Sequence, residues 1–290
     1  MSEKLQNYIN LSRVKKPIGY MLLFWPCLWG LTIAYDFNDS IKNYLFYAFL
    51  FFLGSLLMRT AGCVVNDVVD RKLDSKVLRT KNRPIASNKI SVFEGLLFAS
   101  SLCILALIVL IQFNSLTVIM ALASMPLAFS YPYMKRFTYW PQLFLGITFN
   151  YGLILGWTAI SENLTIIPLV FYFGAIFWTL GYDTIYGYQD LKDDEIIGVK
   201  STSIKFKKNP KKFIFMCYLI FILLQIITGT LMNFGYYYFF GVLLISLHLL
   251  IFQNLSLNIS NPNSCLSKFK SNNFLGLMVF LNILISKIYL

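Results

Sequence analysis

This sequence has few charged residues. Of its 290 residues only 13% are charged, about half the share of a typical soluble domain. Histidine occurs once, and the five cysteines are scattered without a closely spaced pair. The chain also lacks the glycine-rich motifs of P-loop and dinucleotide-binding proteins. These absences exclude a water-soluble globular domain, a disordered chain, a disulfide-stapled secreted domain and a zinc site built from Cys and His.

Most of the remaining residues are apolar. Hydrophobic residues make up 57% of the chain and aromatic residues 17%, and the mean hydropathy is +0.64. A membrane-spanning helix needs roughly 20 apolar residues. The sequence therefore predicts an all-α integral membrane protein, a single domain over residues 1–290 with about nine transmembrane helices in one bundle. The predicted spans are 17–35, 44–65, 92–113, 116–134, 140–160, 166–185, 213–232, 236–252 and 274–290.

The basic residues alternate along the chain. They gather in the N-terminal segment and in the loops after the second, fourth, sixth and eighth spans, whereas the opposite set of loops holds only Lys42. Positively charged loops stay on the cytoplasmic side of a membrane. We therefore expect the N-terminus in the cytoplasm and the C-terminus outside. The net charge of +12 then marks one membrane face and predicts no nucleic-acid partner.

The acidic residues are concentrated in two places. Of the 13 acids, three lie within 66–74 and five within 183–195. Residues spaced by three, four or seven share one face of a helix. The first set with this spacing is Asn66, Asp70 and Asp74, and the second is Asp183, Asp190 and Asp194. Stacked carboxylates repel unless they share a cation, and oxygen ligands without His or Cys suit Mg²⁺.

The two acid stripes occupy corresponding places, after the second and the sixth span, and each is followed by a basic loop. This recurrence suggests two pseudo-repeated four-helix halves plus a ninth helix, with cytoplasmic active-site loops at 66–90 and 186–212. Mg²⁺ is typically held by a few carboxylates together with substrate phosphates. The sequence therefore predicts a diphosphate held between the two stripes. The cations expected near it are Arg59, Arg71, Arg79, Arg83, Lys135, Arg136 and Lys200.

Five blocks of this sequence together resemble the intramembrane aromatic prenyltransferases of the UbiA superfamily. The resemblance covers nearly the whole chain, and the two acid motifs are its most specific part. The blocks are 13–29, 62–74 (GCVVNDVVDRKLD), 79–84 (RTKNRP), 131–136 (YPYMKR) followed by Pro141 and Gln142, and 183–202. The last two are most similar to the branch that acts on hydroxybenzoate.

The resemblance implies a reaction. A polyprenyl diphosphate would be cleaved with the help of two Mg²⁺ ions, and the allylic cation would alkylate 4-hydroxybenzoate at the ring carbon ortho to its hydroxyl. The released diphosphate and a ubiquinone precursor would be the products. The bilayer and other quinone-biosynthesis proteins are expected partners. The absence of a long Arg/Ser-rich leader favours a bacterial inner membrane over a mitochondrial one.

The resemblance also assigns roles to residues. Asp70, Asp74, Asp190 and Asp194 would be the catalytic metal ligands together with Asn66, supported by Asp67 and Asp183. The diphosphate would be bound by Arg71, Tyr131, Lys135, Arg136 and Lys200. The carboxylate of the acceptor needs a fixed cation, for which Arg59 and Arg13 are candidates beside Arg136.

Two other readings stay open at this point. A sister prenyltransferase could act on another acceptor, such as haem, a naphthoate or a lipid ether. From a different class, a cation-coupled transporter would also use acids within a membrane bundle, and it predicts them near the bilayer midplane.

Overall fold

The computed structural model describes residues 3–77 and 79–289, and every regular element in these residues is a helix. The elements are α1 (Glu3–Ser12), α2 (Ile18–Ala34), α3 (Ile41–Asp74), α4 (Val92–Leu110), α5 (Ser115–Ala123), α6 (Met125–Ser130), η1 (Tyr131–Tyr133), α7 (Met134–Phe137), α8 (Pro141–Ser161), α9 (Ile166–Gly187), η2 (Tyr188–Asp190), α10 (Leu191–Ile197), α11 (Thr202–Lys205), α12 (Pro210–Leu231), α13 (Tyr236–Leu247), η3 (His248–Leu255), α14 (Pro262–Lys270) and α15 (Asn272–Ile288). Met1, Ser2, Leu78 and Leu290, which belong to the predicted domain, active-site loop and last span, lie outside the described residues.

The predicted spans all correspond to helices. In the described residues, eight helical stretches are long and apolar enough to cross a membrane, and α2 is a shorter apolar helix of 17 residues. Trp29 and Leu31 of α2 are completely buried, so this helix belongs to the interior of the bundle. The all-α membrane bundle is confirmed. The number of crossings, the side on which the N-terminus lies and the repeat of two halves stay predictions.

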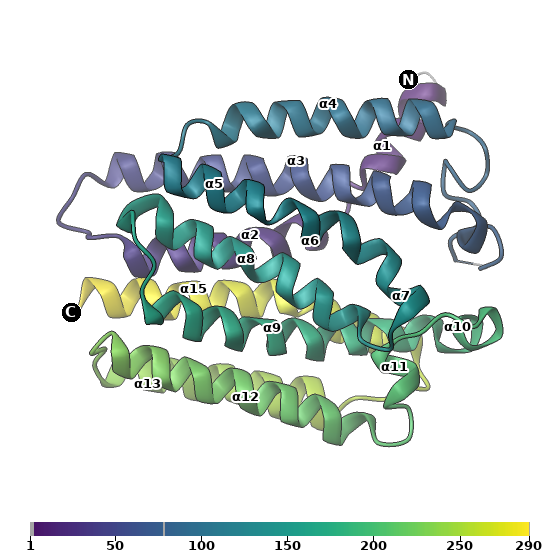
Figure 1. The fold of residues 1–290 in the computed structure, drawn as a ribbon. Helices are drawn as coiled ribbons and strands as arrows, with labels where there is room; N and C mark the ends of the chain where they lie inside the picture. Colours follow the sequence, from purple (N-terminus) through teal and green to yellow (C-terminus); the bar gives the residue numbers. More distant parts are fainter. Residues whose placement is uncertain (1–2, 78, 290) are drawn as a thin grey trace.

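The long helices run side by side, and their connections gather at the two ends of the bundle (Figure 1). The N-terminus lies at one end and the C-terminus at the other. α7, α10 and α11 lie at the same end of the bundle as the segment that joins α3 to α4. Within the bundle α8 contacts both α2 and α9, and α3 contacts α4. The features that the sequence places on the cytoplasmic side are thus collected at one end.

Helix α3 is longer than the predicted span. It continues past residue 65 to Asp74, for 34 residues in all. At a rise of 1.5 Å per residue it is about 51 Å long, whereas the hydrocarbon core of a bilayer is about 30 Å thick. Its last turns therefore project beyond the apolar layer. The predicted active-site segment 66–90 begins with these helical turns, and the segment 186–212 contains the short elements η2, α10 and α11.

The fourth span is broken, in contrast to the continuous helix that the sequence predicts. It consists of α5, α6, η1 and α7, one after the other. Pro126 and Pro132 stand at the start of α6 and within η1. Proline has no backbone N–H and clashes with the preceding turn, so a helix interrupts at such positions. Lys135 lies directly after the last of these breaks.

Glycine permits the closest helix contact in the bundle. A Cβ atom on Gly30 of α2 would stand 2.0 Å from the carbonyl oxygen of Leu153, and one on Gly156 of α8 would stand 2.1 Å from that of Cys27. No side chain fits at either position. In membranes, where helices gain little from burial of apolar surface, such small residues let the backbones approach and pack.

Replacing Gly156 by alanine tests this contact. Because backbone atoms of α2 must move to admit the methyl group, we expect Gly156→Ala to lower the free energy of unfolding by about 1–3 kcal/mol. Thermal unfolding in detergent measures the loss. Gly62→Ala is the matched control, since nothing lies within 4 Å of its added Cβ; equal melting temperatures for the two variants would contradict the packing argument.

Cysteine labelling tests the topology. Asn233 lies between α12 and α13, and Lys208 lies between α11 and α12, so one long apolar helix separates them. In a Cys103→Ser background, which removes the one free cysteine that is not buried, we expect a membrane-impermeant maleimide to label Asn233→Cys only from outside and Lys208→Cys only from the cytoplasm. Labelling of both from the same side would contradict the predicted alternation.

Candidate functional site

A polar cavity of about 210 Å³ opens at the end of the bundle where the acid stripes lie. Its walls come from the end of α3, the segment 75–91, the broken fourth span, the start of α8 and the region from α9 to residue 201. Predicted site residues on its walls are Asn66, Asp70, Asp74, Tyr131, Lys135, Asp183, Asp190, Asp194 and Lys200. The structure thus brings together residues from both acid stripes, as the spacing predicts.

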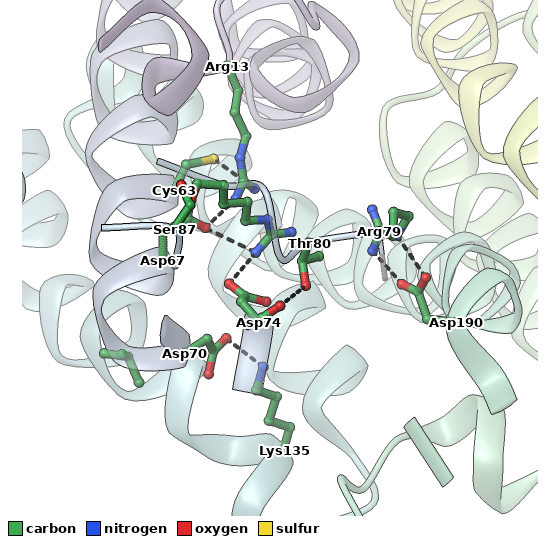
Figure 2. A network of polar contacts seen from close by, with 12 residues as sticks. Arg13, Cys63, Asp67, Asp70, Asp74, Arg79, Thr80, Ser87, Lys135 and Asp190 are labelled. Atoms are coloured by element: carbon green, nitrogen blue, oxygen red, sulfur yellow. Dashed lines mark hydrogen bonds and ion pairs between the residues drawn. The ribbon is translucent and has the colours of Figure 1, made fainter. Parts of the chain in front are cut away.

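The stripe on α3 is as predicted. Asn66, Asp70 and Asp74 are four residues apart on one continuous helix, and the two aspartates project from its last turns (Figure 2). Asp70 is 1% exposed and Asp74 is 6% exposed. Carboxylates buried to this extent need a compensating partner, because loss of hydration disfavours their charge.

The second stripe is not one helix face, contrary to the prediction. Asp183 lies on α9, Asp190 ends the 3-10 helix η2, and Asp194 lies on α10. The chain changes helix type at Tyr188, so a spacing of seven and four does not follow one helical stripe. All three carboxylates still line the cavity. Tertiary packing of the short helices, and not a single helical face, brings the three acids to the cavity.

Basic side chains hold the acids in this structure. Lys135 donates to Asp70 Oδ2 at 2.5 Å, and Arg83 donates to Asp74 Oδ2 at 2.7 Å. Arg79 forms a two-pronged ion pair with Asp190, with its Nε 2.7 Å from Oδ1 (Figure 2). The walls of the cavity therefore carry acidic and basic side chains side by side.

Arg79 ties the segment 75–91 to the second stripe. Its Nη1 also donates to the hydroxyl of Tyr186 at 3.2 Å, and its guanidinium lies over the ring of that tyrosine. Burial disfavours the charge of Arg79, but the hydrogen bonds and charges of Asp190 and Tyr186 outweigh it and raise the pKa of Arg79 above its usual range. Arg79 is thus a permanent cation at the mouth of the cavity.

Asp67 lies away from the cavity. Its Oδ1 accepts hydrogen bonds from Arg13 and, at 3.1 Å, from Arg83. The residue is 1% exposed and stands one position beyond Asn66, which turns it off the α3 stripe. Arg13 also approaches Cys63 Sγ at 3.7 Å. The structure therefore pairs Arg13 and Asp67 with each other. Asp67, predicted at the metal site, and Arg13, predicted to bind the acceptor, both lie off the cavity.

Arg71 and Arg136 line a second hollow of about 550 Å³, which also borders Lys135. Arg136 donates to the carbonyl oxygen of Val69 at 2.8 Å, and its Nη2 lies 3.7 Å from Asp70 Oδ1. These two predicted diphosphate-binding residues are thus next to the cavity but on the other side of Lys135. Lys200 lines the cavity itself and donates to the carbonyl oxygen of Phe137 at 3.3 Å.

Arg79 and Arg83 line the cavity, as expected of cations that neighbour the first acid stripe. Several polar cavity residues were not among the predicted site residues. They are Thr80, Gln142, Tyr186 and Ser201. Gln142 accepts from the backbone N–H of Thr202 at 3.0 Å, which fixes the chain after α10, and nothing in the sequence spacing indicates that contact.

The donor set suits a hard divalent cation, although the described residues contain no ready-made cluster of three metal-binding side chains. Asn66 and the cavity acids offer only oxygen atoms, which Mg²⁺ prefers. Asp70 Oδ1 is buried and accepts no hydrogen bond from the described residues, so it has a free lone pair beside the cavity. The residues therefore fit Mg²⁺. At Asp70 the basic partner Lys135 occupies only the other carboxylate oxygen, whereas at Asp190 both oxygens accept hydrogen bonds from Arg79.

The sequence matches a protein-family model and named relatives. Residues 23–283 match the model of the UbiA prenyltransferase family. A relative from Rattus norvegicus, named 4-hydroxybenzoate polyprenyltransferase, mitochondrial, is 41% identical over 98% of this chain and 76% of its own length.

Two solved structures share the fold. A UbiA homolog from Aeropyrum pernix K1 superposes with a TM-score of 0.76 at 20% identity, over 92% of this chain and 97% of that one. A UbiA homolog from Archaeoglobus fulgidus, bound to GPP and Mg²⁺, superposes with a TM-score of 0.67 at 17% identity, over 96% and 99% of the two chains.

The position of Asp67 predicts a structural role that mutation can test. Asp67→Asn would leave Arg13 and Arg83 without the carboxylate that they share, and we expect the free energy of unfolding to fall by about 2 kcal/mol. Glu195→Gln is the control, because it breaks an exposed pair with Lys207 worth at most about 1 kcal/mol. Equal melting temperatures for the two variants would rule out this role for Asp67.

Proposed function

The chain belongs to the UbiA prenyltransferase family, and on that premise we propose that it transfers a polyprenyl group from polyprenyl diphosphate to 4-hydroxybenzoate. The new bond forms at the ring carbon ortho to the hydroxyl, and diphosphate leaves. Identity of 41% over 98% of the chain to a relative named for this reaction supports the acceptor. The observation that carries the proposal is the convergence of both acid stripes on one cavity.

The residues that would hold Mg²⁺ follow from the cavity. Asn66, Asp70 and Asp74 offer oxygen ligands from α3, and Asp190 with Asp194 offers them from the opposite wall. We propose one ion at each stripe, hence two in all. When bound, Mg²⁺ neutralises the charge that develops on the leaving diphosphate. The Mg²⁺ in the Archaeoglobus fulgidus homolog supports a divalent cation in this fold.

The basic residues of the cavity bind the diphosphate in this proposal. Lys135 and Arg79 now neutralise Asp70 and Asp190, and they would turn to phosphate oxygens once the carboxylates take up metal. Lys200 and the hydroxyl of Tyr131 stand on the same walls. Once they are placed against the diphosphate, these cations would stabilise negative charge where it forms.

The other predicted residues receive indirect roles. Arg71 and Arg136 border the second hollow and would add to the positive potential that attracts an anionic substrate. Asp67 and Arg13 brace α3 against α1 and Arg83. Asp183 would support the ligands from the inner wall. An allylic cation reacts with water, so the apolar bundle around the cavity would protect it until the aromatic ring attacks.

The chain is a multi-pass membrane protein. We propose the bacterial inner membrane as its location. The compared relative is named mitochondrial, which fits the other location considered, and fractionation of the source cells decides between the two. Contacts with other quinone-biosynthesis proteins stay a prediction.

A product assay with matched variants tests the function. Membranes that contain the protein, given 4-hydroxybenzoate, a polyprenyl diphosphate and Mg²⁺, should form the prenylated acid, as read by mass. A chelator should abolish the product and added Mg²⁺ should restore it. Asp70→Ala and Asp190→Ala should each reduce turnover roughly 100-fold or more, because each removes a metal ligand.

Asp39→Ala is the control, since Asp39 is exposed between α2 and α3, at the other end of the bundle. It should keep full activity. Folded Asp70→Ala and Asp190→Ala proteins with normal Mg²⁺-dependent transfer would contradict the metal assignment. Product formation only with haem, a naphthoate or a lipid ether as acceptor would identify a sister enzyme instead.

A further inference from the structure

The segment 205–212, which joins α11 to α12, is densely basic. Five of its eight residues are lysines and none is acidic. The lysines, all of them exposed, are Lys205, Lys207, Lys208, Lys211 and Lys212. The next turn of α12 carries exposed Phe215 and Met216, so the lysines lie where an apolar helix leaves the hydrocarbon layer. A general excess of positive charge on the cytoplasmic side does not explain how closely these five are gathered.

The described residues leave most of this charge unneutralised. The one ion pair of the segment joins Lys207 to exposed Glu195, with Nζ 2.5 Å from Oε1. Lys208 and Lys212 form no hydrogen bond or ion pair with any described residue. Five lysines thus face a single carboxylate. Since like charges so close together repel one another, an anion from outside the chain would stabilise this surface.

Aromatic rings pack beside the basic segment. Phe206 and Phe213 are stacked with their centroids 3.7 Å apart, and Trp140 meets both of them edge-on. The ammonium group of Lys205 lies 4.5 Å from the centroid of the Trp140 ring. Tryptophan concentrates at the headgroup level of a membrane, and a lysine can lay its stem on an apolar surface while its charge stays at the interface. The lysines therefore lie at the depth of lipid headgroups.

Contacts at both ends fix the backbone of the basic segment. Just before it, the backbone N–H of Thr202 donates to Gln142 of α8 at 3.0 Å. Near its other end, Lys211 donates to the carbonyl oxygen of Leu255, the last residue of η3, at 2.6 Å. The other lysines are thus presented from an ordered connection between two helices, as a binding site requires.

We propose that the basic segment binds the phosphate headgroup of an anionic phospholipid, with Lys205, Lys208 and Lys212 as the cations. The phosphodiester supplies the negative charge that the described residues lack, and lysines clustered beside a membrane-spanning helix attract anionic lipids. The acyl chains of the same lipid would lie against exposed Phe215 and Met216 on α12. A free phosphate has no such chains, so the site favours a lipid. The inference does not depend on the proposed function.

Lipid titration of the purified chain tests the proposal. The protein in detergent is titrated with phosphatidylglycerol or with phosphatidylcholine, and native mass spectrometry counts the bound lipids. We expect the wild type to bind phosphatidylglycerol roughly 10-fold more tightly than phosphatidylcholine. The triple variant Lys205→Gln, Lys208→Gln, Lys212→Gln should lose this preference, because it keeps polar side chains without their charge. Arginine at the same three positions should preserve it.

The matched control removes three exposed lysines from the segment that joins α3 to α4, at the same end of the bundle. This variant, Lys76→Gln, Lys81→Gln, Lys89→Gln, should keep the preference. An equal loss in both glutamine variants would assign the attraction to the general charge of this end and overturn the proposal. Equal affinity of the wild type for the two lipids would overturn it as well.

Two further arms keep the outcome decisive. Complete displacement of phosphatidylglycerol by an excess of inorganic phosphate would identify a site for free anions and contradict a lipid site. If the glutamine variant does not fold, the salt dependence of the wild type decides. Ions screen exposed charges, so the preference should weaken at high ionic strength, and an unchanged preference there would exclude the lysines as its source.

Discussion

Buried carboxylates at the end of an apolar bundle must be neutralised, and the arrangement of this site depends on that requirement. Asp70 and Asp74 are nearly without solvent, and Lys135 and Arg83 compensate them. Lys135 lies on α7, at the end of the fourth span, and from there reaches Asp70 on α3. Arg83 and Arg79 reach their partners because the segment after α3 folds back over the helix end. The connecting segments at this end of the bundle therefore supply the cations that neutralise its acids.

Much of this architecture can be predicted from the sequence. Apolar runs locate the helices, and spacing by four places Asn66, Asp70 and Asp74 on one face, since a single helix carries all three. What the sequence does not yield depends on tertiary packing. The pair of Arg79 and Asp190 joins positions 111 residues apart through an irregular segment, which no local periodicity describes. The predicted apolar span ends at residue 65, whereas the helix that contains it continues to Asp74, in agreement with the predicted acid stripe.

The helical spacing gives the wrong direction for two residues, Asp67 and Asp190, and each error has a simple physical cause. Asp67 adjoins the stripe in sequence, but successive residues on a helix differ by about 100° in direction, so it faces Arg13 instead of the cavity. Asp190 follows Asp183 at helical spacing, yet the 3-10 turn at residues 188–190 interrupts the helix between Asp183 and Asp194. In both cases the residue type indicated a polar role, whereas the direction of the side chain could be read only from the three-dimensional structure.

The central claim is that the two acid stripes act together on one metal-bound diphosphate. Counting bound Mn²⁺ by electron paramagnetic resonance, with a non-reactive prenyl thiolodiphosphate present, tests it most directly. We predict two ions per chain in the wild type, and at most one after alanine replaces either Asp70 and Asp74 or Asp190 and Asp194. Absence of analogue-dependent binding, or a count of two in both double variants, would contradict the account.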